Sequence, residues 1–231
     1  MSGFEQTRWS LIVAARGTRR HARPALEQLC RAYRAPVLAY VRYSGHALED
    51  AEDLTQGFFV HFLEHGCYAR ADPERGHFRS LLLTSLRRFL IDQYHYEHAG
   101  KRHAYLVGDD AIDSLVDEGN SPEQAFTRTW LATVLRHAMS HLEQEWQAAG
   151  KAAQFERLAP LLLEAADSSE LKVIAAASGM RSNTIAVQIH RMRQRLRQLV
   201  RLELLQTVGS HEALERELSE LRGFTILDTV P

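Results

Sequence analysis

Apolar residues recur every three or four positions along most of the chain, which is the period of an amphipathic α-helix. The pattern predicts four long helices, over residues 26–43, 49–65, 78–98 and 122–147. No stretch shows the strict alternation of a half-buried strand, and the sequence contains no Asn-Gly hairpin signal. We therefore expect an all-α fold.

Residues 103–121 interrupt this pattern. The stretch has little apolar periodicity and ends in the turn-forming run Gly119-Asn120-Ser121 before Pro122. We interpret it as a linker between two helical domains. The predicted organisation is a first domain over 1–102, the linker over 103–121, a second domain over 122–205 and a C-terminal extension over 206–231.

Charge is segregated along the chain, although 28 Lys and Arg side chains nearly balance 29 Asp and Glu. Residues 172–201 contain seven basic side chains and no acid, whereas residues 103–124 contain six acids and residues 49–69 five, both without Lys or Arg. Blocks of opposite sign indicate separate surfaces for separate partners. The net charge of −1 therefore does not argue against nucleic acid.

Several classes of protein are excluded by what the sequence lacks. No run approaches the roughly 18 apolar residues of a membrane span, and residues 1–10 lack the apolar core of a signal peptide. The two cysteines, Cys30 and Cys67, lie far apart, which excludes a disulfide framework and a four-cysteine zinc site. We expect a cytoplasmic protein without membrane association.

Enzymatic and metal chemistry find little support. His61 and His65 lie near Cys67, and His137 and His141 repeat the same spacing, but neither group supplies a convincing set of three or four ligands. No phosphate-binding glycine loop, nucleophile elbow or paired-carboxylate arrangement is evident. We expect no metal, no cofactor and no catalytic activity.

Residues 170–201 have the pattern of a helix-turn-helix motif. Such a motif needs a small residue where its helices cross, a residue that tolerates positive φ in the turn, and an aliphatic anchor in the second helix; Ala175, Gly179 and Ile185 supply these in order. Ser182 is the predicted N-cap of the second helix. One apolar stripe follows along that helix, formed by Ile185, Ile189, Met192, Leu196 and Leu199.

The opposite face of this second helix is polar and basic. Recognition helices contact bases in the major groove through residues near their N-terminus, while arginines farther along neutralise phosphates. The alternative is an ordinary helical hairpin whose arginines are simply solvated. The predicted DNA contacts are Arg181, Ser182, Asn183, Thr184, Val187, Gln188, Arg191 and Arg195.

Residues 174–197 (IAAASGMRSNTIAVQIHRMRQRLR) closely resemble domain 4 of bacterial extracytoplasmic-function sigma factors, most specifically over 189–196. Residues 50–63 (DAEDLTQGFFVHFL) are similar to the helix of sigma domain 2 that docks on core RNA polymerase, and residues 25–43 resemble the helix before it. Residues 78–92 (FRSLLLTSLRRFLID) are similar to the helix that recognises and melts the −10 element.

The resemblance implies a sigma factor, with a domain 2 helical bundle and a domain 4 helix-turn-helix joined by the acidic linker. It would bind the clamp coiled coil and the flap of core RNA polymerase and direct promoter-specific initiation by recognising −35 and −10 elements and melting −10 DNA. It would be a DNA-binding polymerase subunit and no enzyme in itself. Whether an anti-sigma protein or a kinase regulates it stays open.

The resemblance also assigns residues. The predicted polymerase contacts are Asp50, Glu52, Asp53, Gln56 and Phe59. The predicted −10 DNA contacts are Tyr68, Arg75, Arg79, Arg87, Arg88, Lys101 and Arg102. Three further apolar or aromatic side chains are expected in the core rather than in base stacking, namely Phe89, Leu90 and Tyr94.

Some positions depart from the family or suggest regulation. Gly57 stands where the family usually has an acid, and Arg88 where it usually has Asn. Thr55 is a candidate phosphorylation site, because added negative charge on the docking helix would alter polymerase binding. In the extension, Leu214, Leu218 and Leu221 share one helical face, which predicts a stabilising cap, a cover for the DNA-binding surface or a docking site for a regulator.

Two other classes of protein compete with this interpretation. A one-component regulator would have the helix-turn-helix and a helical ligand-binding or dimerisation domain, and would form a dimer on a palindromic site. An enzyme or metal protein could contain helical hairpins by chance. The pair formed by residues 50–63 and 78–92 favours the sigma factor, since a repressor has no need of it.

Overall fold

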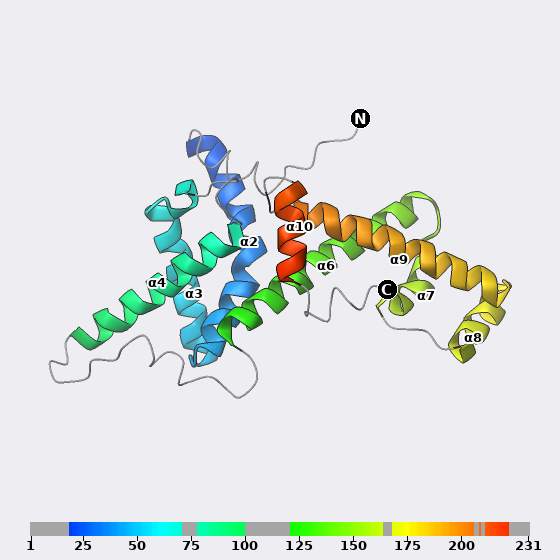
Figure 1. The fold of residues 1–231 in the computed structure, drawn as a ribbon, viewed down its shortest axis with the longest axis horizontal. Helices are drawn as coiled ribbons and strands as arrows, with labels where there is room; N and C mark the ends of the chain where they lie inside the picture. The colour runs from blue at the N-terminus through cyan, green and yellow to red at the C-terminus, as the bar shows by residue number, and fades with distance from the viewer. Residues whose placement is uncertain are drawn as a thin grey trace. The chain divides into compact units, whose positions relative to one another are not determined.

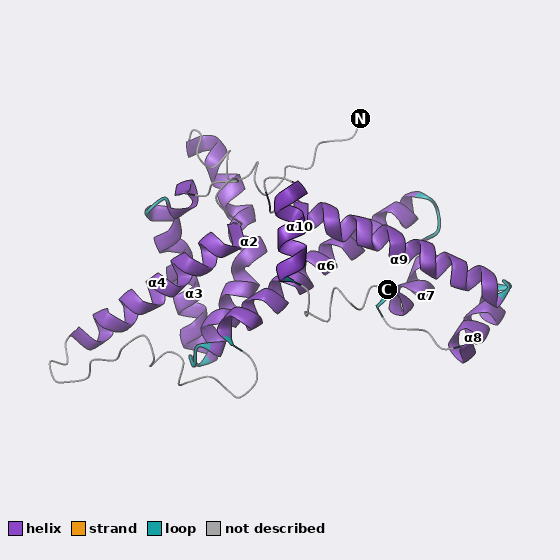
Figure 2. Ribbon diagram, viewed as in Figure 1, coloured by secondary structure: helices purple, strands orange, loops and turns teal. Residues whose placement is uncertain are grey.

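The computed structural model describes residues 19–70, 78–99, 121–163, 168–205, 208 and 211–221. Every regular element within these ranges is helical (Figures 1 and 2), in agreement with the all-α prediction. Of the predicted linker, only Ser121 is described. Three of the predicted −10 contacts also lie outside the described residues, namely Arg75, Lys101 and Arg102.

The chain divides into two compact units. The first comprises Met1–Leu131 with Gln206–Ala213, and the second comprises Ala132–Leu205 with Leu214–Pro231. The division falls inside the helix α6 (Pro122–Ala148), whose first ten residues belong to the first unit by their packing. The second domain predicted from the sequence begins at the start of this helix.

The first unit is built from α2 (Arg19–Tyr43), α3 (Leu48–Glu64), the short 3₁₀ helix η1 (Cys67–Arg70), α4 (Phe78–Ala99) and the start of α6. Three predicted helices are thus present. Helix α2 begins at Arg19, before the predicted start at residue 26. The predicted start is later because residues 19–25 are mostly polar and show no apolar periodicity.

Aromatic side chains form the centre of the first unit. The ring of Phe78 lies edge-on to those of Tyr33 and Phe62, with centroids 5.2 and 6.3 Å away. Phe58 packs in the same way on Phe89 at 5.8 Å. All five rings are at most 5% exposed. These contacts pack α3 against α2 and α4. They therefore determine which face of α3 is turned away from the core.

The second unit contains the rest of α6, α7 (Ala152–Leu158), the 3₁₀ helix η2 (Ala159–Leu162), α8 (Ser168–Ser178), α9 (Ser182–Leu205) and α10 (His211–Glu220) from Leu214 on. All five residues of the predicted α9 stripe are buried, which confirms the face of this helix that turns to the core. An ion pair between Arg201 and Glu215 ties α10 to α9.

Glycine ends two helices of this unit. After α8, Gly179 has φ +64°, the Gly179 N–H donates to the Ala176 carbonyl at 3.3 Å and the Met180 N–H to the Ala175 carbonyl at 3.0 Å. These are the two bonds of a Schellman motif, which needs a residue in the left-handed region. Gly150, with φ +71°, ends α6 in the same way. The turn predicted at Gly179 is therefore confirmed.

Three expectations need correction. Helix α9 begins at Ser182 and the Arg181 carbonyl accepts the Ile185 N–H, so the capping residue is Arg181 rather than Ser182. Tyr94 is 43% exposed and not in the core, unlike Phe89. Thr55 is 1% exposed, so a kinase cannot reach its hydroxyl in the folded chain and the proposed phosphorylation switch is wrong.

Within the extension, Leu214 and Leu221 are buried and Leu218 is half-buried, so the predicted apolar face is present. Among the described helices, none combines the length and the apolar character that a membrane span requires.

Candidate functional site

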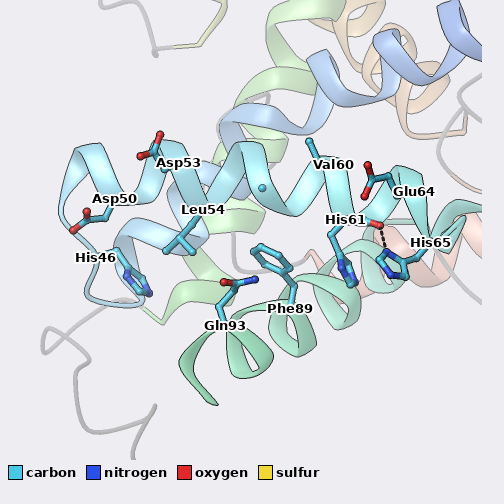
Figure 3. Close-up of a pocket in the computed structure, with 11 residues that line it drawn as sticks. His46, Asp50, Asp53, Leu54, Val60, His61, Glu64, His65, Phe89 and Gln93 are labelled. Carbon is cyan, nitrogen blue, oxygen red and sulfur yellow. Dashed lines mark hydrogen bonds between the residues drawn. The ribbon is translucent and has the colours of Figure 1, made fainter. Parts of the chain in front are cut away.

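An open groove of about 600 Å³ runs along α3 beside α4 in the first unit (Figure 3). Most of the residues that line it lie on one face of α3. The others come from the turn before that helix and from two positions of α4. The lining residues are His46, Asp50, Asp53, Leu54, Gly57, Val60, His61, Glu64, His65, Phe89 and Gln93.

The groove is polar and acidic. Asp50, Asp53 and Glu64 contribute three carboxylates, and no Lys or Arg is among its lining residues. None of these carboxylates forms an ion pair or a hydrogen bond with another side chain in the part of the chain that the structure describes. Three histidines also line the groove, namely His46, His61 and His65.

Two of these histidines are ordered by contacts. The rings of His61 and His65 stack with centroids 4.1 Å apart, and the His65 Nδ1 lies 2.9 Å from the His61 carbonyl oxygen, to which it donates when protonated (Figure 3). His61 also packs on Phe89 at 5.4 Å. Beneath them Gly57 leaves space: a Cβ there would meet the Phe89 ring at an ordinary contact distance of 3.5 Å.

The structure separates the five predicted polymerase contacts. Asp50 and Asp53 line the groove together. Glu52 lies on another face, with a carboxylate oxygen 3.8 Å from the guanidinium of Arg34 on α2. Phe59 lines a small apolar cavity between α2 and the other helices of the unit. Gln56 is exposed but is not a lining residue of the groove.

Sequence reasoning missed the rest of this face. The helical spacing from Asp50 through Asp53, Gly57 and His61 to Glu64 would have identified the stripe on α3. Nothing local indicates Gln93, because it comes from α4.

The predicted −10 contacts also divide. Arg87 and Arg88 are exposed on α4. Arg79 is half-buried: its guanidinium carbon lies 5.4 Å from the centroid of the Trp130 ring, and its Nη1 donates to the Thr127 hydroxyl oxygen at 3.3 Å. Arg79 therefore contributes to packing within the first unit. Tyr68 is half-buried on η1 beside the ring of Phe62, with centroids 6.4 Å apart.

Most of the predicted DNA contacts at the start of α9 are exposed. The predicted contacts that are exposed at this end of the helix are Arg181, Asn183, Thr184, Val187 and Arg191. Val187 is 43% exposed. Ser182, Gln188 and Arg195 are half-buried.

The arginines farther along α9 are largely held by their own unit. Arg195 binds both carboxylate oxygens of Glu145, with its Nε 3.0 Å from Oε2. This hydrogen bonding lowers the pKa of Glu145 and raises the pKa of Arg195. Arg193 donates from Nη2 to the Leu161 carbonyl at 2.8 Å. Arg191, by contrast, has no ion-pair partner among the described residues.

Gln188 is fixed by a second element. The Nε2 of Gln154 on α7 donates to the Gln188 Oε1 at 2.8 Å, and the Gln188 Nε2 lies 4.0 Å from the Met180 sulfur. Residue spacing could not have indicated Gln154, because 34 positions separate it from Gln188.

His137 and His141, which share the HxxxH spacing noted in the sequence, lie next to a buried carboxylate. Glu203 on α9 is 5% exposed, and its two oxygens lie 3.6 Å from the His137 Nδ1 and 3.8 Å from the His141 Nδ1. Across the described ranges, no group of three or more His, Cys, Asp or Glu side chains is arranged to hold a metal ion. The arrangement joins α6 to α9.

Comparison of the chain with protein-family models, with curated proteins and with solved structures gave no match.

Proposed function

We propose that this chain is a sigma factor of the extracytoplasmic-function type, which binds core RNA polymerase and directs promoter-specific initiation. The observation that carries the proposal is the α8–turn–α9 unit, in which a glycine turn, a buried α9 stripe and an exposed polar face occur together. In this proposal the chain has no catalytic residues and acts in the cytoplasm as a polymerase subunit.

The α9 surface supports recognition of the −35 element. A helix in the major groove contacts base edges with side chains of its first turns. Asn183, Thr184 and Gln188 offer donors and acceptors there, and Val187 offers an apolar contact. Arg181 and Arg191 are exposed for phosphates, which position the protein without specifying sequence.

The α3 groove supports docking on polymerase. Its lining residues include no Lys or Arg, so the field of its three carboxylates is available to a partner. Complementary charge raises the association rate and fixes the register of a protein interface. The partner surface is therefore basic, as expected for the clamp coiled coil. The flap would receive the second unit.

The surface of α4 supports contact with melted −10 DNA. Arg87 and Arg88 are exposed, and Tyr94 and Tyr96 are 43% and 81% exposed farther along the helix. Basic groups that follow a backbone, together with aromatic faces for bases, are typical of single-strand binding.

Transcription in vitro tests the proposal. Bacterial core RNA polymerase is mixed with this chain on fragmented bacterial genomic DNA, and transcript 5′ ends are mapped. The expected result is initiation at discrete sites that share two sequence elements, with none in reactions of core polymerase alone. Identical transcripts with and without the chain would contradict the proposal. A dimer that binds palindromic duplex DNA but not polymerase would instead support the one-component regulator.

A further inference from the structure

We infer that Gln154 on α7 is a positioning residue for base recognition: it holds the Gln188 side chain in the orientation that matches adenine. The inference rests on the proposed function and adds to it a residue from outside the recognition helix and the identity of one base. The predicted base contacts of α9 differ in whether a side chain of another helix holds them. Among the described residues, Gln188 is a predicted base contact of α9 that another helix, α7, holds by a hydrogen bond.

Two contacts determine how the Gln188 carboxamide is turned. Its Oε1 accepts a hydrogen bond from the Gln154 Nε2 at 2.8 Å, and its Nε2 faces the Met180 sulfur, a weak acceptor, at 4.0 Å. Reversing the Gln188 amide alone would set two NH₂ groups against each other. Reversing both amides would keep a hydrogen bond between them but would set the Gln188 oxygen against a sulfur that has no proton to donate, so the Met180 contact decides between the two orientations.

The remaining hydrogen-bonding capacity of Gln188 is specific. After these contacts Oε1 keeps one acceptor position and Nε2 keeps one N–H. In the major groove adenine presents the N6 amino donor beside the N7 acceptor, and a carboxamide binds both at once. Guanine presents two acceptors, which a fixed amide of this polarity matches less well. The amide held by Gln154 therefore selects adenine.

Pre-orientation matters because a glutamine on a helix surface has several rotamers and can present either end of its amide. Fixing one rotamer before binding removes part of the entropic cost of the base contact. Since Gln154 and Gln188 are both half-buried, the bond between them is partly shielded from competing water.

A selection experiment tests this inference with the full-length chain. The chain, tagged and mixed with bacterial core RNA polymerase, captures duplexes from a randomised library, and the bound DNA is sequenced. Four variants are compared with the wild type: Gln188→Ala, Gln154→Ala, the double variant, and Gln154→Glu. Gln147→Ala is the matched control, because Gln147 is an exposed glutamine of α6 outside this contact.

The wild type is expected to prefer adenine at one position by about five- to a hundredfold, the range of a good bidentate contact. Gln188→Ala abolishes that preference. Gln154→Ala reduces it severalfold at the same position, leaves the salt dependence of binding unchanged, and adds nothing to Gln188→Ala in the double variant. Gln154→Glu keeps the side-chain shape but accepts instead of donating, so it turns the Gln188 amide and weakens adenine selection. Gln147→Ala matches the wild type.

A purely structural role for Gln154 would lower affinity equally for all sequences and leave the base preference intact, which overturns the inference. A wild-type preference at the Gln188 position that survives in both Gln154 variants overturns it as well, while the proposed function stands. No enriched sequence for the wild type, with or without polymerase, overturns both.

Discussion

The acidic face of α3 and the basic face of α9 differ in how many of their charges are already paired within the chain. Along the α3 groove, Asp50, Asp53 and Glu64 have no partner among the described residues. On α9, Arg193 and Arg195 are bonded to groups of their own unit, and Arg201 pairs with Glu215. A count of charges along a sequence therefore does not measure the charge that is available to a partner.

Docking on a protein and distinguishing DNA sequences make different demands on a surface. A surface that docks on a large basic protein gains from unpaired carboxylates spread along a groove, because complementary potentials steer association. A surface that distinguishes sequences gains from short polar side chains held in place, because phosphate contacts carry no sequence information. In this chain Arg193 and Arg195 bind groups of their own unit, whereas Arg181 and Arg191 are exposed, as the proposed phosphate contacts require.

The largest effect expected on the α9 side is a loss of stability in Arg193→Ala. The variant leaves the Leu161 carbonyl without its charged donor, and hydrogen bonds to charged groups contribute about 1.5–3 kcal/mol. The free energy of unfolding, measured by urea titration, should fall by that amount. Arg191→Ala is the control and should stay within about 0.5 kcal/mol of the wild type, because Arg191 is exposed. Equal losses would remove the distinction between structural and available arginines.

The salt dependence of DNA binding should separate the same two arginines in the opposite way. Each phosphate contact contributes about 0.9 to the slope of log K against log salt on duplex DNA. Arg191→Ala should lower the slope by about 0.9, whereas Arg193→Ala should leave it unchanged. Fluorescence anisotropy with a labelled duplex at several salt concentrations measures both. A fall in slope for Arg193→Ala would place its guanidinium on the DNA.

Gly57 allows a smaller test on the α3 side. The space beside Phe89 admits a methyl group, so Gly57→Ala should gain about 0.5–1 kcal/mol of stability from helix propensity. Because the methyl group leaves the three carboxylates in place, polymerase affinity should stay unchanged. Thermal unfolding and a binding titration check the two statements. A variant less stable than the wild type would contradict the space for a methyl group beside Phe89.

The smallest expected effect concerns pH. Arg195 lowers the pKa of Glu145 in the folded chain below its ordinary 4.5. The ion pair therefore adds stability that is present above that ordinary value and is lost as the pH falls through the lower folded pKa. The pair is partly exposed, so the effect stays within about 1 kcal/mol. Acid titration of stability should be shallower for Glu145→Gln than for the wild type, and identical curves would contradict the pairing.

Much of the fold could be predicted from local pattern, because helices, stripes and glycine turns depend on neighbours in sequence. The buried face of α9 and the positive φ of Gly179 are examples. Helical spacing also indicates that Thr55 is buried, because the residue continues the stripe of Ala51, Phe58 and Phe62. Tyr94 was misassigned because an apolar period alone does not show where a helix leaves its core.

The candidate site was predictable in outline but not in its pairings. Spacing predicts the buried and polar faces of α9 and the acidic character of α3, on which the proposed function rests. It could not show that Glu145 binds Arg195 or that Gln154 holds Gln188, because these partners come from helices distant in sequence. Nor could spacing show that Asp53 lines the groove while Glu52 lies near Arg34 of α2. That difference depends on where α2 and α4 pack against α3.

Binding of the intact chain to bacterial core RNA polymerase tests the central claim most directly. The wild type, Asp53→Arg and Glu52→Arg are each mixed with core enzyme and passed through a gel-filtration column. The two variants make the same change of charge on neighbouring residues of α3, one in the groove and one outside it. The wild type and Glu52→Arg are expected to move into the polymerase peak, whereas Asp53→Arg is expected to elute apart from it. A wild type that elutes apart from polymerase, or two variants that bind equally, would contradict that claim.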